Sequence, residues 1–480
     1  MLFNSIDFFI FLPVVFLLYW FTFLTRKWRN LLIVIVSYIF YGWWDPRFLV
    51  LIAITSLSSY FCGLLIERYE KSRKRQKMIN TANIILNLGI LGIFKYFNFF
   101  LDNITTITSA CGIHMDYVTI NIILPVGISF YTFQALSYTI DVYQNKTKAT
   151  HDIIEFFAYI SFFPQLVAGP IERATHLLPQ FQKERYFDYA KAVDGLRQML
   201  WGFFKKIVIA DNCAVIVDNY WGYHDILSGR MLILLGVLFA FQIYCDFSGY
   251  SDIAIGCARL FGFNLAPNFK TPYLSRSIPD FWRRWHISLM TWFRDYLYFP
   301  LGGNRYSKWK ACRNVLVVWI LSGLWHGANW TFIVWGLYHA TLLIIYNMNS
   351  HRVELQRNLT RNRIITNIIR LLQTATTFSL VIIGWMIFRA ENISQAWRFI
   401  SSIFTHSFMG LGFIDGRKWL MAGICIMIIE WFQRNRSHAL DFSIKGIFHY
   451  RLARWFIYYI LIYLIFNYAG QNQAFIYFQF

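Results

Sequence analysis

Charged residues are scarce in this chain, and few of them are acidic. Only 15% of the 480 residues are charged, with 25 Asp and Glu against 45 Lys and Arg, while 57% are hydrophobic and 20% aromatic. A soluble domain carries about 25% charged residues. The apolar segments also follow one another too closely for a row of soluble domains, so the composition predicts one polytopic membrane unit.

Several chemical signatures are missing as well. The seven cysteines are scattered, with no CxxC pair and no Cys/His spacing of a zinc site, so neither a disulfide framework nor a metal site is expected. The sequence also has no GxSxG nucleophile elbow and no phosphate-binding loop. If the protein is an enzyme, its chemistry must therefore be carried out by other side chains.

The net charge of +20 comes from short basic clusters between apolar runs. One cluster holds Arg26, Lys27 and Arg29, and a denser one is ERYEKSRKRQK at 67–77. Such clusters orient membrane spans and bind anionic headgroups, so we expect both on the cytoplasmic side and no nucleic-acid partner. The segment near 102–118 is polar and poor in basic residues, which predicts the outer side.

The apolar runs predict the fold class. The first, SIDFFIFLPVVFLLYWFTFL, lacks a basic start and a small-residue cleavage site, so it is expected to be a first span and not a signal peptide. Runs at 30–44 and 47–66 meet at Asp45-Pro46, a turn signal, and predict a hairpin. With the later runs, the pattern predicts an all-α polytopic membrane protein with about ten to twelve spans. We expect one domain over residues 1–480, with core motifs at about 120–345.

Two segments in the middle of the chain predict broken or re-entrant helices. LPVGISFYTFQALSYTIDVY at 124–143 mixes Pro, Gly and polar residues with aromatics, and FFPQLVAGPIER at 162–173 contains two prolines and a glycine. Interrupted helices at membrane depth are tolerated where they pack in protein or line a cavity. A purely lipid-facing bundle would not need them.

Ionisable residues inside apolar runs are costly and usually functional. In YCDFSGYSDIAIG, Asp246 and Asp252 are six residues apart, about 600° of helix, and do not share a face. This spacing favours structural contacts between helices over a paired-carboxylate acid and base.

A histidine also lies in the aromatic segment at 277–310. Trp282 and His286 are four residues apart and predict one face of an amphipathic helix at the cytoplasmic interface, with Arg283, Arg284 and Arg294 as its charged residues. From the spacing alone, His286 is either a functional residue or an ordinary interface residue of a surface helix.

A second histidine lies in SGLWHGANWTFIVWGLYHA, at 322–340, which is typical of a membrane-buried helix. There His326 would share a face with Gly323 and Asn329, and the small residues would admit a close neighbour or ligand. A neutral imidazole can serve as a general base, here for a substrate hydroxyl that attacks an activated acyl carbon. Arg and Lys side chains at the cytoplasmic mouth could hold an anionic acyl carrier. His339, about 220° further round a straight helix, is expected to be structural.

These motifs together resemble the membrane-bound O-acyltransferase family, and specifically its bacterial alginate O-acetyltransferase branch. The resemblance runs almost from end to end. It rests on the segments at 124–143, 162–173, 244–256 and 322–340 quoted above, on FWRRWHISLMTWFRDYLYFPLGG at 281–303, and on the terminal FIYFQF.

The resemblance implies roles that the spacing alone does not give. It implies His326 as the membrane histidine, His286 as the second catalytic position and Tyr477 as an acyl relay. Beside these roles, we expect Asn329, Arg283 and Arg284 to contact substrate. A phenyl ester keeps more acyl-transfer potential than an alkyl ester, since a phenol has a pKa near 10. The alternative for the terminus is an aromatic belt at the membrane interface.

The family also implies a many-helix fold with a central tunnel in the cell inner membrane. The acyl donor would be acetyl-CoA or another acyl thioester, with no tightly bound cofactor. The acceptor would be an envelope polysaccharide, completed by an SGNH-type partner outside the membrane. Two other functions stay open: D-alanyl transfer to teichoic acid, and a transporter or flippase without chemistry.

Overall fold

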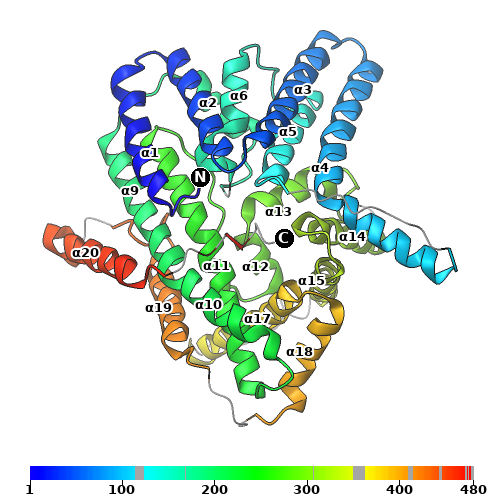
Figure 1. Cartoon of the computed structure of the whole chain (residues 1–480), viewed down its shortest axis with the longest axis vertical. Helices are drawn as coiled ribbons and strands as arrows, with labels where there is room; N and C mark the ends of the chain where they lie inside the picture. The colour runs from blue at the N-terminus through cyan, green and yellow to red at the C-terminus, as the bar shows by residue number, and fades with distance from the viewer. Residues whose placement is uncertain are drawn as a thin grey trace. The chain divides into compact units, whose positions relative to one another are not determined.

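The computed structural model spans the whole chain and describes residues 1–113, 124–167, 169–305, 307–349, 363–408, 414–442, 446–470, 473, 475 and 476. Every regular element in these ranges is a helix (Figure 1). The all-α prediction is therefore confirmed.

The described helices include five that are long and apolar enough to cross a membrane. These are Pro46–Arg68, Arg73–Ala110, Gly229–Leu260, Trp330–Met348 and Ile364–Arg389. Two shorter apolar helices are Ile6–Thr22 and Ile153–Leu166. Because several helices qualify, the multi-pass membrane prediction is confirmed, while the number of ten to twelve spans and the central tunnel stay predictions.

By compactness the chain divides into two units. The first is Met1–Leu196 with Ile253–Ala266, and the second is Arg197–Asp252 with Pro267–Phe480. The division does not test the prediction of one domain over 1–480, which stays a prediction. Each unit is described separately below.

The first unit is built from the N-terminal helices. In it α3 lies beside α4 and α5, and α2 lies beside α6 (Figure 1). Its helices are α1 (Ile6–Leu17) with the π-helical turn η1 (Leu18–Thr22), α2 (Arg26–Gly42), η2 (Pro46–Phe48), α3 (Leu49–Arg68), α4 (Arg73–Ala110), α5 (Ile128–Tyr143), α6 (Ile153–Ser161), α7 (Phe163–Leu166) and α8 (Ala174–Gln182).

The predicted turn at Asp45-Pro46 is confirmed. The Asp45 carboxylate accepts a hydrogen bond from the backbone N–H of Arg47 at 2.9 Å, and Pro46 is the first residue of η2. Proline suits this position because the first N–H groups of a helix have no intrahelical partner. The turn therefore separates α2 from α3 as the sequence predicts.

One of the two predicted interruptions is present, and the other stays a prediction because residues 114–123 before it lie outside the described residues. The chain breaks at Phe162 between α6 and α7, with Pro164 in the first turn of α7. In the segment 124–143, Gly127 adopts a left-handed φ of +74° directly before α5, which then runs unbroken from Ile128 to Tyr143. The polar side chains of α5 are satisfied inside the protein: Gln134 donates to the carbonyl of Tyr159 at 2.7 Å, and Ser137 to that of Gln134 at 2.7 Å. Polar residues in α5 thus reflect packing and not a break.

The predicted outer segment near 102–118 begins as helix, because α4 continues to Ala110. Residues 114–118 lie outside the described residues. Cys111, directly after α4, is exposed. The basic segment 67–77 lies at the opposite end of the same helix, where Ser72 is its N-cap residue. The accessibility of the two ends of α4 therefore tests how this helix is oriented in the membrane.

We expect the Ser72 end of α4 in the cytoplasm and the Cys111 end outside. In intact cells, a membrane-impermeant thiol reagent should label a variant whose only cysteine is Cys111. It should not label a variant whose only cysteine comes from Ser72→Cys until the cells are permeabilised. Labelling of the cysteine at 72 in intact cells would contradict this orientation.

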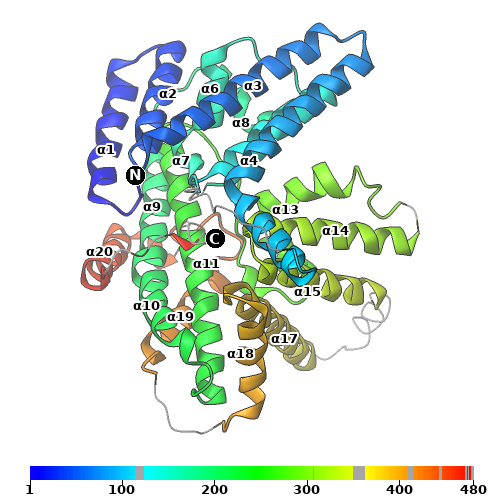
Figure 2. The ribbon, with the colours of Figure 1, turned by 45° about the vertical axis from the view of Figure 1, so that its right-hand side comes forward.

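The second unit begins within α9 (Tyr189–Phe203) and contains the histidine motifs. Figure 2 shows α14 and α15 side by side, and they are antiparallel, since Gly323 lies against Phe332 and Gly336 against Trp319. The elements that follow α9 are η3 (Phe204–Ala210), α10 (Asp211–Tyr220), η4 (Trp221–Tyr223), α11 (Gly229–Leu260), η5 (Pro272–Leu274), α12 (Ile278–Arg284), α13 (Ile287–Phe293), η6 (Arg294–Tyr298), α14 (Lys308–His326), α15 (Trp330–Met348), α17 (Arg363–Arg389), α18 (Ile393–Thr405), α19 (Arg417–Gln433), η7 (Gly446–His449) and α20 (Arg451–Tyr468).

Candidate active site

His326 is the last residue of α14 and does not lie within a longer helix. The backbone is extended at Gly327, and α15 starts after Asn329, whose side-chain oxygen accepts from the N–H of Thr331 at 3.0 Å. Asparagine is a preferred N-cap residue for this reason. The prediction of one helix through 322–340 is therefore wrong, and Asn329 does not share a helical face with His326.

The small residues near His326 let α15 approach α14 closely. A Cβ atom at Gly323 would lie 2.2 Å from the carbonyl oxygen of Phe332, and one at Gly336 would lie 2.3 Å from that of Trp319. Only glycine fits such contacts between backbones. The close neighbour that the sequence predicts is thus the next helix of the same chain.

Aromatic rings surround the His326 imidazole. Its ring centroid is 5.0 Å from that of Trp325, 5.0 Å from that of Trp335 and 5.3 Å from that of Phe388. The side chain is 5% exposed. Close-packed rings restrict side-chain rotation, so His326 is held in a fixed orientation at the end of α14.

His286 occupies a break between α12 and α13. Its φ is +45°, a left-handed conformation that is uncommon for residues other than glycine. Asn268 holds the break: its carbonyl accepts from the N–H of Ile287 at 2.9 Å, and its side-chain oxygen accepts from the hydroxyl of Ser288 at 2.9 Å. The predicted helical face shared by Trp282 and His286 is wrong because the helix ends between them.

The structure brings the two predicted catalytic histidines to one indole ring. The Trp325 centroid lies 5.6 Å from that of His286 and 5.0 Å from that of His326. His286 is 1% exposed, and its ring also packs edge-on against Phe247 at 4.7 Å. Two backbone breaks, 40 residues apart in sequence, thus present imidazoles to one aromatic cluster.

His339 lies in a tryptophan cluster. Its ring is 4.8 Å from Trp282, 5.5 Å from Trp319 and 5.1 Å from Trp335, between centroids. Trp335 contacts His339 one turn further along α15, and it also contacts His326 because the chain reverses between α14 and α15. This packed position fits the structural role expected for His339.

The three residues expected to contact substrate differ in their partners and in their exposure. The side-chain amide of Asn329 donates to the carbonyl of Glu391 at 2.8 Å, and its side-chain oxygen accepts from the N–H of Thr331. Both polar atoms of this side chain are therefore hydrogen-bonded to the backbone. Arg284 forms an ion pair with Asp280 at 2.9 Å, while Arg283 is exposed. Of the three, Arg283 is the side chain most accessible to a solvent-borne ligand.

The two aspartates of α11 bind different lysines. The Lys206 ammonium lies 2.8 Å from Asp246 and 2.8 Å from Asp211, while that of Lys205 lies 2.6 Å from Asp252. Buried charges are stable only when paired and hydrogen-bonded. These ion pairs support the structural interpretation of Asp246 and Asp252. The two lysines inside the apolar run WGFFKKIVIA are the one sign of this network in the sequence, and they were not among the predicted site residues.

The same network holds the C-terminal segment. Asp246 accepts from the backbone N–H of Ile476 at 2.7 Å, and Lys206 donates to the carbonyl of Gln473 at 3.1 Å. Phe475 packs on Phe247 at 5.8 Å between centroids, and Phe247 is also the neighbour of His286. Gln473 and Ile476 are therefore held by the ion-pair network, and Phe475 lies against the aromatic cluster around the histidines.

Tyr477 itself lies outside the described residues. Its chain neighbour Ile476 is buried and held on Asp246. The relay predicted for Tyr477 thus stays a prediction, next to an anchored segment.

Comparison with known proteins places this arrangement in a family. The model of the membrane-bound O-acyltransferase family matches residues 39–387, which include both histidines. The chain is 42% identical over 403 residues to the probable alginate O-acetylase of Azotobacter vinelandii, covering 84% of this chain and 77% of that protein. It is 34% identical over 433 residues to the peptidoglycan O-acetyltransferase of Helicobacter pylori, covering 84% and 80%.

A more distant relative is the teichoic acid D-alanyltransferase of Bacillus subtilis. The identity is 31% over 284 residues, which covers 56% of this chain and 70% of that protein. The family model and the extended matches agree with the motifs and with the helical membrane architecture. This chain belongs to the membrane-bound O-acyltransferase family.

Proposed function

We propose that this protein transfers acetyl groups across the cytoplasmic membrane for O-acetylation of a cell-envelope or extracellular polysaccharide. The observation that carries the proposal is the placement of His286 and His326 around Trp325, inside the region matched by the family model. Relatives named for alginate and for peptidoglycan acetylation each align with 84% of the chain, which favours acetyl transfer to a glycan over D-alanyl transfer.

His326 is the general base in this proposal. A ring nitrogen takes the proton of an acceptor hydroxyl, and the oxygen attacks the carbonyl carbon of an acyl thioester. The carbon–sulfur bond breaks, and the departing thiolate receives the proton from the imidazolium. His286 is the second catalytic residue, fixed by the turn that Asn268 holds.

Tyr477 is the first acceptor in this scheme. The anchoring of Ile476 and Phe475 supports this role, because Phe475 packs on Phe247, the neighbour of His286. The phenol oxygen takes the acetyl group from the thioester, and a sugar hydroxyl or an SGNH-type partner outside the membrane takes it from the phenol. Each transfer breaks one acyl bond and forms another, so no cofactor is consumed.

Turnover of a thioester by the purified protein tests the proposed activity. With acetyl-CoA as donor, the full chain in detergent or bilayer discs should release free thiol and transfer acetyl to an added glycan. D-alanyl thioester should be a poor donor. If the protein turned over neither thioester but moved a glycan across the bilayer, it would be a transporter and the proposal would be wrong.

A further inference from the structure

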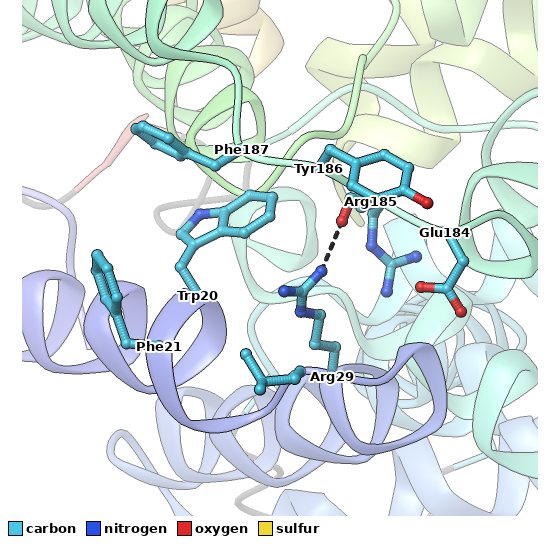
Figure 3. A pocket seen from close by; sticks show the side chains of 8 residues that line it. Trp20, Phe21, Arg29, Glu184, Arg185, Tyr186 and Phe187 are labelled. Atoms are coloured by element: carbon cyan, nitrogen blue, oxygen red, sulfur yellow. Dashed lines mark hydrogen bonds between the residues drawn. The ribbon is translucent and has the colours of Figure 1, made fainter.

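A pocket in the first unit is lined by two buried arginines. It has a volume of about 250 Å³, and its walls come from the end of the first apolar helix, from α2 and from residues 184–187 (Figure 3). Pockets that enclose whole small molecules measure roughly 300–1,000 Å³. This pocket therefore has room for a headgroup, while the rest of a ligand would lie outside it.

Arg29 is the principal cation of the pocket. Its side chain is only 7% exposed, and its Nε donates to the carbonyl of Phe23 at 2.7 Å while its Nη1 donates to that of Arg185 at 2.6 Å. Its guanidinium also lies 4.8 Å from the centre of the Trp20 ring. These hydrogen bonds hold Nε and Nη1 of the guanidinium. Its Nη2 donates to none of the residues that the structure describes.

Arg185 adds a second buried cation. It is 6% exposed, and it donates to the hydroxyl of Tyr19 at 2.5 Å, to the carbonyl of Gln180 at 2.8 Å and to the side chain of Asn30 at 2.6 Å. All three acceptors are neutral oxygens, so they satisfy hydrogen bonds without cancelling the charge.

Neither guanidinium has a carboxylate in an ion pair among the described residues. Arg26, one helical turn before Arg29, contrasts with them because it pairs with Glu155 at 2.5 Å. Buried charges are ordinarily paired. Two buried cations beside an opening therefore indicate that the compensating anion comes from outside the chain.

The rim of the pocket is apolar and exposed. Phe21 is 71% exposed, Leu24 is 68% exposed and Phe187 is 50% exposed. They lie at the end of the apolar helix Ile6–Thr22 or beside it in the pocket wall. Exposed aromatic and aliphatic side chains next to cations are typical of the level at which lipid headgroups meet acyl chains.

We propose that this pocket binds the phosphate of an anionic phospholipid, with Arg29 as the main contact and the rim residues against the acyl chains. The proposal concerns a lipid and not the acyl donor, because the exposed apolar rim suits a ligand with long hydrocarbon chains. It does not depend on the proposed acetyl transfer, since lipid retention is measured without turnover.

Lipid retention by the full chain tests the site. Protein released from bilayers of equal phosphatidylglycerol and phosphatidylcholine is examined by native mass spectrometry, which counts the two lipids that stay bound. The wild type should retain phosphatidylglycerol preferentially. Arg29→Gln should lower that preference about tenfold, because it removes a charge-assisted contact in a desolvated site. Lys27→Gln is the matched control, since Lys27 is exposed and two residues away.

A second variant keeps the test decisive if Arg29→Gln fails to fold. Glu184 is an exposed carboxylate in the pocket wall, and it forms none of the hydrogen bonds that hold Arg29 or Arg185. Glu184→Gln removes a repulsive charge and should raise phosphatidylglycerol retention about two- to fivefold, the range for an exposed charge pair. A merely structural role for the arginines would not produce this increase.

Three results would overturn the proposal. The first is an equal effect of Arg29→Gln and Lys27→Gln, which would show a general charge effect. The second is unchanged lipid retention in Glu184→Gln. The third is loss of bound phosphatidylglycerol from the wild type on addition of millimolar inorganic phosphate, which would assign the pocket to a soluble phosphate compound.

Discussion

Replacing His326 with alanine is expected to lower acyl transfer by about 10²- to 10⁴-fold, the usual contribution of a general base. The imidazole is enclosed by Trp325, Trp335 and Phe388 at the end of α14, and the turn beyond it is held by Gly327 and the cap of Asn329. The variant should therefore fold and reach the membrane. The measurement is acetylation of the polysaccharide in cells and thioester turnover by the purified protein.

His339→Ala is the matched control for that variant. It removes the same ring from the same α14–α15 hairpin, and His339 also contacts Trp335. Because His339 packs among tryptophans, its loss should lower the melting temperature in detergent while the folded fraction still transfers acyl groups. Near wild-type acetylation by His326→Ala, or equal loss of turnover per folded molecule in both variants, would rule out a general-base role for His326.

His286 needs a different substitution because of its backbone. A φ of +45° is costly for most residues but not for glycine. His286→Gly should therefore preserve the turn that Asn268 holds and remove only the imidazole. Severe loss of transfer in this folded variant would separate the chemistry of the ring from the strain of the turn.

The sequence predicted the membrane architecture well because that architecture depends on local composition. Long apolar runs, basic clusters and the Asp45-Pro46 turn act over a few residues each, and α2 and α3 lie on either side of that turn as they indicate. His326 was predicted as a base both from its apolar, small-residue segment and from the family resemblance, whereas the catalytic role predicted for His286 came from the resemblance.

Helix breaks at the site could not be read from periodicity. Aromatic and apolar residues flank both 285–286 and 327–329, so a helical pattern can be drawn across positions where the chain turns, and Gly327 and Asn329 are the only local signals of the second break. At His286 the turn depends on Asn268, which lies 18 residues earlier and holds the backbone of Ile287. A distant hydrogen-bonding partner leaves no mark on local spacing.

The ion pairs of the buried lysines likewise depend on partners that are distant in the sequence. Lys206 lies five residues from Asp211 in the sequence, but its other partners, Asp246 and Gln473, lie far along the chain. These distant pairings could not be predicted from the sequence, and neither could their consequence, the anchoring of Gln473 and Ile476. These contacts bear on the role of Tyr477, which follows Ile476 in the sequence.

Tyr477→Phe is expected to abolish transfer to the polysaccharide while leaving the fold intact. Phenylalanine keeps the ring and its packing and removes only the oxygen that would carry the acetyl group. The anchor of the segment does not involve that oxygen, because it uses the N–H of Ile476, the carbonyl of Gln473 and the ring of Phe475. Changing Asp246 would be a poorer test, since removing one partner of a buried ion pair costs about 3–5 kcal/mol.

Detection of an acetyl group bound to the enzyme would measure the relay directly. With donor present and acceptor absent, mass spectrometry of the C-terminal peptide of the wild type should show an added acetyl group on Tyr477. With His326→Ala the same peptide should remain unmodified, because no base takes the phenolic proton. If the terminus is only an aromatic anchor at the membrane interface, Tyr477→Phe should acetylate the polymer normally, since a phenylalanine packs there much as a tyrosine does. A fully active Tyr477→Phe protein would therefore end the relay proposal and leave His326 as the centre of a direct transfer from thioester to acceptor.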